Sequence, residues 1–165
     1  MISTAEQAGI RNQGQLFASS GNVAIDANGR LVNSGTMAAA NVQDMNNTAE
    51  HKVNIRSQAF ENSGTAVSQQ GTQIHSQSIQ NTGKLLSAGT EDLAVSGSLN
   101  NQNGEIATNQ QLIIHDGQQS TVVIDNTNGT IQSGRDVAFR QNRYPTTAHL
   151  PLIINWILRY KMIFM

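Results

Sequence analysis

The chain has 165 residues, enough for one domain with its own core, and a formal net charge of -1. Only 13% of its residues are charged, which argues against an extended phosphate-binding surface, so we expect no nucleic-acid partner. Cysteine is absent, which excludes disulfides and thiolate metal sites.

The first nine residues contain no basic stretch followed by an apolar run, so the sequence shows no signal peptide. Residues 2–9 fit the end of a preceding repeat. Secretion of this chain would therefore require that it belong to a longer protein.

Six copies of one short motif organise the chain between Ile10 and Gly129. Each copy consists of an apolar residue, an arbitrary residue and Asn, followed two or three positions later by Gly. The copies are Ile10/Asn12/Gly14, Leu31/Asn33/Gly35, Phe60/Asn62/Gly64, Ile79/Asn81/Gly83, Leu99/Asn101/Gly104 and Ile124/Asn126/Gly129. Their apolar residues are separated by 21, 29, 19, 20 and 25 positions. A recurring unit of about twenty residues predicts a solenoid in which each unit forms one turn.

The residues after each Gly alternate with a period of two, which is typical of a strand and not of a helix. Two positions after Gly stand Leu16, Met37, Ala66, Leu85, Ile106 and Ile131. Four positions after Gly stand the small residues Ala18, Ala39, Ser68, Ser87, Thr108 and Ser133. The column between them admits Gln132, so we expect the first two columns to face the core.

A second predicted strand follows in most units. Its apolar pairs are Val23/Ile25, Val53/Ile55, Leu93/Val95, Leu112/Ile114 and Val137/Phe139, while the third unit has only Ile74. One unit has too few large apolar side chains to offset the conformational entropy lost on ordering it. Stacking pairs each strand with its copies in neighbouring turns and aligns like residues into columns. The sequence therefore predicts an all-β fold, a parallel β-helix of about six turns.

Asn and Gly are predicted to form the corners between strands. The nominated corner residues are the Asn and Gly of the six motifs: Asn12, Asn33, Asn62, Asn81, Asn101, Asn126, Gly14, Gly35, Gly64, Gly83, Gly104 and Gly129. Gly can adopt the positive φ that a tight corner needs, and Asn tolerates it better than most residues. The asparagine amides of successive turns should also hydrogen-bond to one another along the axis.

Two insertions, residues 41–50 and residues 116–120, interrupt the repeat and are predicted to be surface loops. Loops on a rigid scaffold are where binding residues often lie. A tolerated insertion without a role is the favoured interpretation of both.

We divide the chain into a β-helical region, residues 1–140, and a non-repeat apolar tail, residues 141–165. The tail holds both prolines, both tyrosines and the only tryptophan. It falls short of the roughly 20 apolar residues that span a bilayer. Three interpretations stay open: the tail caps the solenoid, it lies on a membrane surface, or it is the translation of a shifted reading frame. The abrupt change of composition favours the last.

The six Φ-x-Asn-x-Gly turns, each with a strand after its Gly, resemble the haemagglutinin repeats of filamentous haemagglutinin and its relatives, over about residues 9–140. These proteins are the exoproteins of two-partner secretion and include adhesins, haemolysin-like proteins and the sticks of contact-dependent inhibition toxins. The resemblance implies a right-handed β-helical fibre that crosses the outer membrane through a dedicated β-barrel transporter and is secreted or displayed at the cell surface. The family's secretion domain and toxin domain have no counterpart in the sequence.

Parallel β-helices also occur among sugar-cleaving enzymes, which need acids and bases clustered on one face of adjacent turns. The candidates, expected at different points of the repeat, are Asp26, Arg56, Asp92, His115 and Asp136. Glycosidase chemistry needs two carboxylates at a defined separation, and the repeat does not predict such a pair. Asp92 and Asp136 are assigned to one column before the second strand, as turn formers.

The four histidines, His51, His75, His115 and His149, are scattered along the sequence. Their spacings do not suggest the convergent ligands of a zinc site. We therefore nominate no catalytic, cofactor-binding or metal-binding residue, and we expect neither a cofactor nor enzymatic activity.

The expected function is structural: a segment of the shaft of a secreted or surface-displayed haemagglutinin-like adhesin, with host-cell glycans or surface proteins as partners by resemblance. The alternatives are a stick segment of a contact-dependent inhibition protein, which would meet the surface of a target bacterium, and a remnant of an interrupted gene without function. A polysaccharide lyase or hydrolase has less support.

Overall fold

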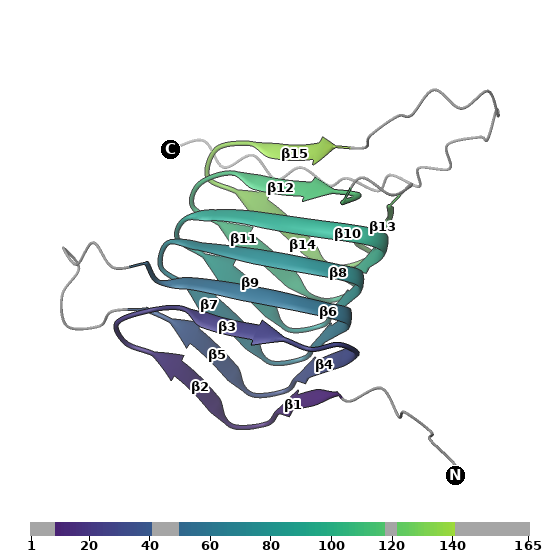
Figure 1. Ribbon diagram of the computed structural model, residues 1–165. Coiled ribbons are helices and arrows are strands. Elements are labelled where there is room, and N and C mark those ends of the chain that lie inside the picture. The colour runs from purple at the N-terminus through teal and green to yellow at the C-terminus, as the bar shows by residue number, and fades with distance from the viewer. Residues whose placement is uncertain (1–8, 41–49, 118–121, 141–165) are drawn as a thin grey trace, which may run out of the picture.

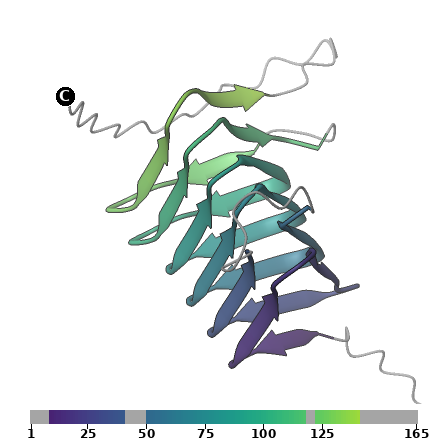
Figure 2. The same ribbon diagram turned by 90° about the vertical axis from the view of Figure 1, so that its left-hand side faces the viewer.

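The computed structural model describes residues 9–40, 50–117 and 122–140, and over these residues the chain is all-β. Its strands stack as a solenoid of six turns, with two parallel sheets on opposite sides of a continuous core (Figures 1 and 2). The predicted parallel β-helix is therefore confirmed. The described residues contain no helix, and so none that is long and apolar enough to cross a membrane.

The larger sheet, sheet A, has the order β1-β4-β6-β8-β10-β12-β15, with β3 also paired to β6 and β13 to β10. Its strands are β1 (Ile10–Asn12), β3 (Val23–Asp26), β4 (Arg30–Asn33), β6 (Lys52–Asn62), β8 (Gly71–Asn81), β10 (Thr90–Asn100), β12 (Leu112–His115), β13 (Val123–Asp125) and β15 (Val137–Arg140). The three central strands are 11 residues long, so they are longer than the sequence predicts. Each combines the second strand of one turn with the opening of the next, because few residues separate the two.

The smaller sheet, sheet B, has the order β14-β11-β9-β7-β5-β2. Its strands are β2 (Gln15–Ala18), β5 (Thr36–Ala39), β7 (Thr65–Ser68), β9 (Lys84–Ser87), β11 (Glu105–Thr108) and β14 (Thr130–Ser133). In every pair of neighbouring strands, the residue two positions after the motif Gly lies beside its equivalent in the next turn, as predicted. The residue four positions after the Gly does the same.

The core is built from columns of like residues that run through the stack. The opening residues Leu31, Phe60, Ile79 and Leu99 are paired in register and at most 1% exposed. Met37, Ala66, Leu85 and Ile106 form a second buried column from sheet B. Ile55, Ile74, Leu93 and Ile114 form a third from sheet A. Burial of these columns is the main stabilising contribution that the fold offers.

The register of the fourth turn differs from the prediction. Leu93 pairs with Ile74 and Ile114, so its turn contributes the pair Glu91/Leu93 at the place where Leu93/Val95 was predicted. Val95 is also apolar and lies two positions after Leu93. The sequence therefore fits the shifted alignment equally well. The consequence is that Glu91 occupies an inward position.

Several predictions fall outside the described residues. These are the end of a preceding turn within residues 1–8, the insertion at residues 41–49, most of the second insertion, residues 118–121, and the tail at residues 141–165.

Candidate functional site

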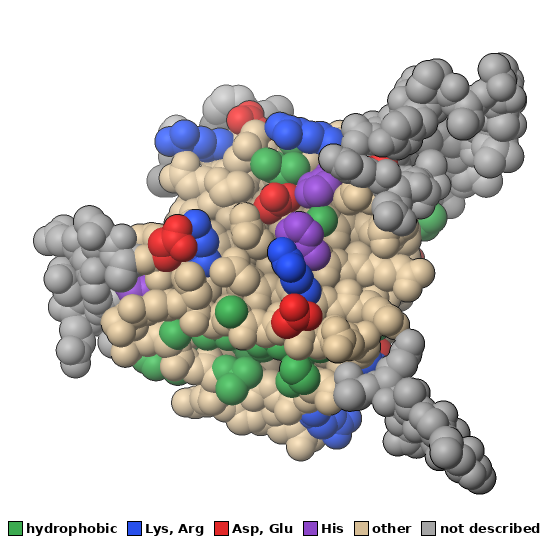
Figure 3. Space-filling model, viewed as in Figure 1, with side chains coloured by type: hydrophobic (Ala, Val, Ile, Leu, Met, Phe, Trp, Pro, Cys, Tyr) green, Lys and Arg blue, Asp and Glu red, His purple; other side chains and the backbone are tan. Residues whose placement is uncertain are grey.

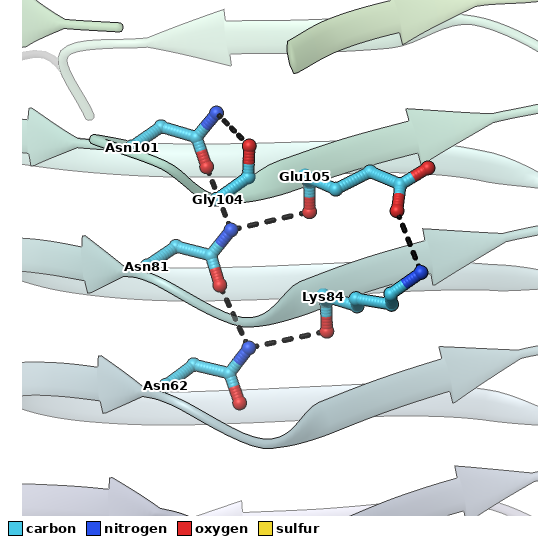
Figure 4. A network of polar contacts seen from close by, with 6 residues as sticks. All are labelled: Asn62, Asn81, Lys84, Asn101, Gly104 and Glu105. Carbon is cyan, nitrogen blue, oxygen red and sulfur yellow. Dashed lines mark hydrogen bonds and ion pairs between the residues drawn. The ribbon is translucent and has the colours of Figure 1, made fainter. Parts of the chain in front are cut away.

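The corner before sheet B carries an axial ladder of asparagine side chains. Each Asn amide nitrogen donates to the Oδ1 atom of the Asn in the next turn, at 2.6 to 2.8 Å, from Asn12 through Asn33, Asn62, Asn81 and Asn101 to Asn126. The same nitrogen also donates to a backbone carbonyl of the next turn, for example from Asn81 to Glu105 at 3.1 Å (Figure 4). The ladder predicted from the sequence is present, and it joins all six turns.

Ladder residues in the interior of the stack are shielded from water. Asn33, Asn62, Asn81 and Asn101 are at most 1% exposed. Each of their amides is satisfied by its neighbours, so the ladder adds polar specificity to an apolar core without leaving a buried donor unpaired. Because a one-residue slip of any turn would break two rungs, the ladder fixes the register of the stack.

The motif glycines are required for a reason other than the one predicted. None of the six has a positive φ. A Cβ atom on Gly35, Gly64 or Gly83 would lie 2.0 to 2.1 Å from the carbonyl oxygen of the preceding turn's Gly. Close stacking of successive corners therefore excludes a side chain, and the expectation that these glycines supply positive φ is wrong. In the last two turns, where one more residue separates Asn from Gly, the left-handed positions are Asn103 (φ 58°) and Asn128 (φ 56°).

The outer face of sheet A carries the second group of functional interest. Strand register aligns one outward column from the first turn to the last, which consists of Asp26, Arg56, His75, Ala94, His115 and Arg140. Figure 3 shows the basic and histidine side chains as a stripe across this face. The prediction that Asp26, Arg56 and His115 occupy different points of the repeat is wrong. His75 and His115, which lie far apart in the sequence, also share this column. The insertions at residues 41–50 and 116–120 hid the alignment of Asp26 and Arg140 with the other members of the column.

A shallow depression of about 390 Å³ lies at the C-terminal half of this stripe, lined by His75, Asp92, Ala94, Ile113, His115, Asp116, Gly117 and Arg140. Its centre is Ala94, whose small side chain separates the two histidines in the column. The depression offers cationic, anionic and neutral hydrogen-bonding groups to a solute.

Asp92 and His115 form a close polar contact in the depression. His115 Nε2 lies 3.1 Å from Asp92 Oδ1, without the alignment of a hydrogen bond. The other ring nitrogen, Nδ1, accepts a hydrogen bond of 3.2 Å from the backbone N–H of Gly117. The hydrogen bond from Gly117 occupies the Nδ1 lone pair of His115 and holds the turn after β12.

Asp92 and Asp136 do not share a column, contrary to the prediction. Asp92 pairs with Gln73 and Ile113 within the strands of sheet A. Asp136 precedes β15, and its carbonyl accepts a hydrogen bond of 2.9 Å from the N–H of Leu112. The two residues are offset by two positions, which follows from the shifted register of the fourth turn.

Glu91 is the residue that sequence reasoning missed. It is 0% exposed, lies in register between Thr72 and Leu112, and neither of its carboxyl oxygens has a hydrogen-bond partner. Burial raises the pKa of Glu91 well above its usual value. The signal was available, because aligning Leu93 with Ile114 places Glu91 opposite Leu112.

The remaining histidines do not join this group. His51 is fully buried at the corner before β6, and His149 lies outside the described residues. Among the described residues, no three His, Cys, Asp or Glu side chains converge in a way that could hold a metal ion.

Comparison of the chain with protein-family models, with curated proteins and with solved structures gave no match. The class of protein defined by the geometry is therefore a parallel β-helical solenoid, and function has to be argued from its surfaces.

Proposed function

We propose that the chain is a shaft segment of a secreted or surface-displayed bacterial adhesin of the haemagglutinin-repeat type. The observation that carries the proposal is the unbroken asparagine ladder from Asn12 to Asn126, which ties six turns into one continuous stack. A rod of this kind holds attached loops or domains at a fixed distance from their point of anchorage.

Adhesion by such a shaft would depend on many weak contacts along its faces, amplified by multivalency. The outward column of sheet A supports this part of the proposal, since it repeats along the axis and ends in the depression between His75 and Arg140. Host-cell glycans or surface proteins are the proposed partners, and export of the full-length protein would use an outer-membrane β-barrel transporter. A stick of a contact-dependent inhibition protein would use the same rod.

The test of display is the size and location of the native product, detected with an antibody against residues 79–124 in cell, membrane and medium fractions. A large product at the surface or in the medium supports a shaft, and a toxin domain at its C-terminal end would assign it to the inhibition proteins. A product of 17.8 kDa confined to the cytoplasm would contradict the proposal.

The test of adhesion is binding of beads coated with the purified chain to host cells and to an array of glycans. We expect a His75→Ala/Arg140→Ala variant to bind less than the wild type. Lys84→Ala is the matched control, because Lys84 is an exposed cation on sheet B. Equal binding of all three proteins would contradict adhesion through sheet A while leaving the shaft itself untouched.

A further inference from the structure

The asparagine ladder has a direction, and this makes its two ends complementary. Each Asn donates toward the C-terminal end of the stack and accepts from the N-terminal side. In the first turn, the Oδ1 atom of Asn12 has no donor among the described residues. In the last turn, the one acceptor of Asn126 Nδ2 among the described residues is the carbonyl of Gly129 within its own corner, at 3.3 Å. The C-terminal end therefore presents a donor, and the N-terminal end an acceptor.

The strands of the first and last turns also match one another. The first turn consists of β1, β2 and β3, with 3, 4 and 4 residues, and the last of β13, β14 and β15, with the same lengths. Within the described residues each of these strands is paired on one side only. Parallel strands of equal length can continue a ladder across such an end. Asn126 and Gly129 are one residue further apart than Asn12 and Gly14. The corners of Asn81 and Asn101 differ in the same way, and their side chains are still joined by a ladder bond of 2.6 Å.

Apolar side chains that are buried in interior turns are exposed at both ends. Ile10 and Leu16 are 38% exposed in the first turn, and Val137 and Phe139 are 41% exposed in the last. Ile10 and Leu16 belong to the columns of Ile124 and Ile131. Val137 and Phe139 belong to the columns of Val23 and Ile25. A turn stacked on either end would bury these residues as the interior turns do.

The glycine of the first corner fits the same arrangement. A Cβ atom on Gly14 would meet nothing within 4 Å, whereas the glycines of the next three corners are held against the carbonyl of a preceding turn. In the part of the chain that the structure describes, no earlier turn lies beside Gly14. Its missing side chain leaves the room that a stacked corner needs.

From these features we infer that the 165-residue chain assembles head to tail, with the last turn of one copy stacked on the first turn of a second copy. Asn126 Nδ2 of one copy donates to Asn12 Oδ1 and to the carbonyl of Gln15 of the next, which repeats the two bonds that Asn12 itself makes to Asn33 and Thr36. The contact joins two different surfaces, so it does not close on itself and extends into a filament. This inference does not depend on adhesion or secretion.

Sedimentation equilibrium of the full chain over a concentration series tests the assembly. We expect species at multiples of 17.8 kDa whose share grows with concentration. Asn126→Asp keeps the acceptor that Asn101 uses but replaces the outward donor, and Gly14→Ala fills the space beside the first corner. Both variants should remain folded by circular dichroism and lose assembly at least tenfold, while Arg56→Ala on the outer face should assemble like the wild type. A chain that stays monomeric throughout the series would overturn the inference.

The head-to-tail direction of the contact can be tested separately by disulfide cross-linking, because the chain contains no cysteine of its own. Gln15 and Thr130 are both exposed, belong to one column, and would come to lie on neighbouring strands across the contact. Adjacent strands are about 4.8 Å apart, which allows a disulfide. Under mild oxidation, a mixture of Gln15→Cys and Thr130→Cys copies should cross-link, and neither variant alone should do so. Cross-linking of either variant with itself at an equal rate would indicate a different contact and would overturn the head-to-tail arrangement.

Discussion

Thr72 and Glu91 are neighbours in one inward column of the β-helix, but only Thr72 has a hydrogen-bond partner there. The Thr72 hydroxyl lies 2.9 Å from the hydroxyl of Ser68, at the corner between β7 and β8. Ser87, the equivalent of Ser68 in the next turn, interacts with Ser68 and with the N–H of Gly89. Glu91 is thus a buried carboxyl group in a column whose next member is Leu112, and its presence lowers the stability of the stack.

Replacing Glu91 by leucine should therefore stabilise the protein. The change removes an unsatisfied buried polar group and continues the apolar column of Leu112, which together are worth about 2 kcal/mol. Urea denaturation measures the difference. Glu61→Leu is the control, because Glu61 is partly exposed and paired with Arg30, so its replacement should not stabilise. A Glu91→Leu protein less stable than the wild type would mean that the carboxyl group has a partner after all.

The free energy of unfolding should also fall as the pH rises, because Glu91 ionises. The pKa of Glu91 is raised in the folded state because burial penalises its charged form. This ionisation penalty is absent below the pKa of an unfolded glutamate, about 4.3, and stability is lost as the pH rises from there toward the folded value. The slope is at most about 1.4 kcal/mol per pH unit. Comparing the wild type with Glu91→Gln between about pH 5 and about pH 8 isolates this residue, because other titrating groups cancel in the difference. Parallel profiles would contradict the assignment.

At acidic pH, Glu61 should have the opposite effect, so that the free energy of unfolding decreases as the pH falls. The hydrogen bond from Arg30 lowers the pKa of Glu61, so this contribution is present above the pKa of an unfolded glutamate and is lost as the pH falls through the folded value. This window lies below that of Glu91. The pair is largely exposed, and its effect should be small.

Alanine at Gly83 and at Gly14 should have very different effects on folding. A Cβ atom on Gly83 would lie 2.1 Å from the carbonyl oxygen of Gly64, so the stack would have to separate, at a cost of about 3 kcal/mol or more. A Cβ atom on Gly14 would meet nothing within 4 Å, and the free energy of unfolding should change by less than about 0.5 kcal/mol. Thermal melts of dilute protein measure both. Equal effects would show that the glycines act through their conformational freedom and not through close approach.

The sequence was sufficient to predict the fold because residues close together within each repeat unit identify its strands. An apolar residue before each Asn and another after each Gly identify the inward face of two strands, and the register pairs Phe60 with Ile79 as the motif requires. The asparagine ladder follows from the same spacing, because stacked turns place equivalent side chains within hydrogen-bonding distance.

Features that depend on two turns at once were not predictable in the same way. The role of Gly83 lies in the position of Gly64 of the preceding turn, which no local pattern encodes. The outer column of His75 and His115 requires the register between turns, and Ala94, which lies between them, carries neither charge nor a polar group that would reveal it. Polar outward positions carry no apolar signal that could restore the alignment, so the candidate site emerged only from the structure.

Removing the side-chain amide of Asn81 should destabilise the centre of the stack. Asn81 accepts from Asn62 and donates to Asn101 and to the carbonyl of Glu105. In Asn81→Ala these buried groups lose their partner, and we expect a loss of about 3 kcal/mol. Asn12→Ala is the matched control, because it has a single Asn neighbour and lies at the end of the ladder, so its loss should be smaller. Similar losses at the two positions would argue against cooperative stabilisation along the ladder.

An acidic residue should be tolerated on the outer side of sheet B and not on its inner side. Leu85 and Leu86 are adjacent in β9, but Leu85 is 0% exposed between Ala66 and Ile106, whereas Leu86 points outward and is partly exposed. Leu85→Asp would bury a carboxyl group without a partner and remove a large apolar side chain, which should cost at least about 4 kcal/mol and abolish folding of much of the protein at room temperature. Leu86→Asp should cost about 1 kcal/mol or less. Circular dichroism melts of the two variants, which differ by one position in sequence and by the face on which the charge lies, measure this contrast. A melting temperature unchanged by Leu85→Asp would show that the inward face of sheet B is misassigned.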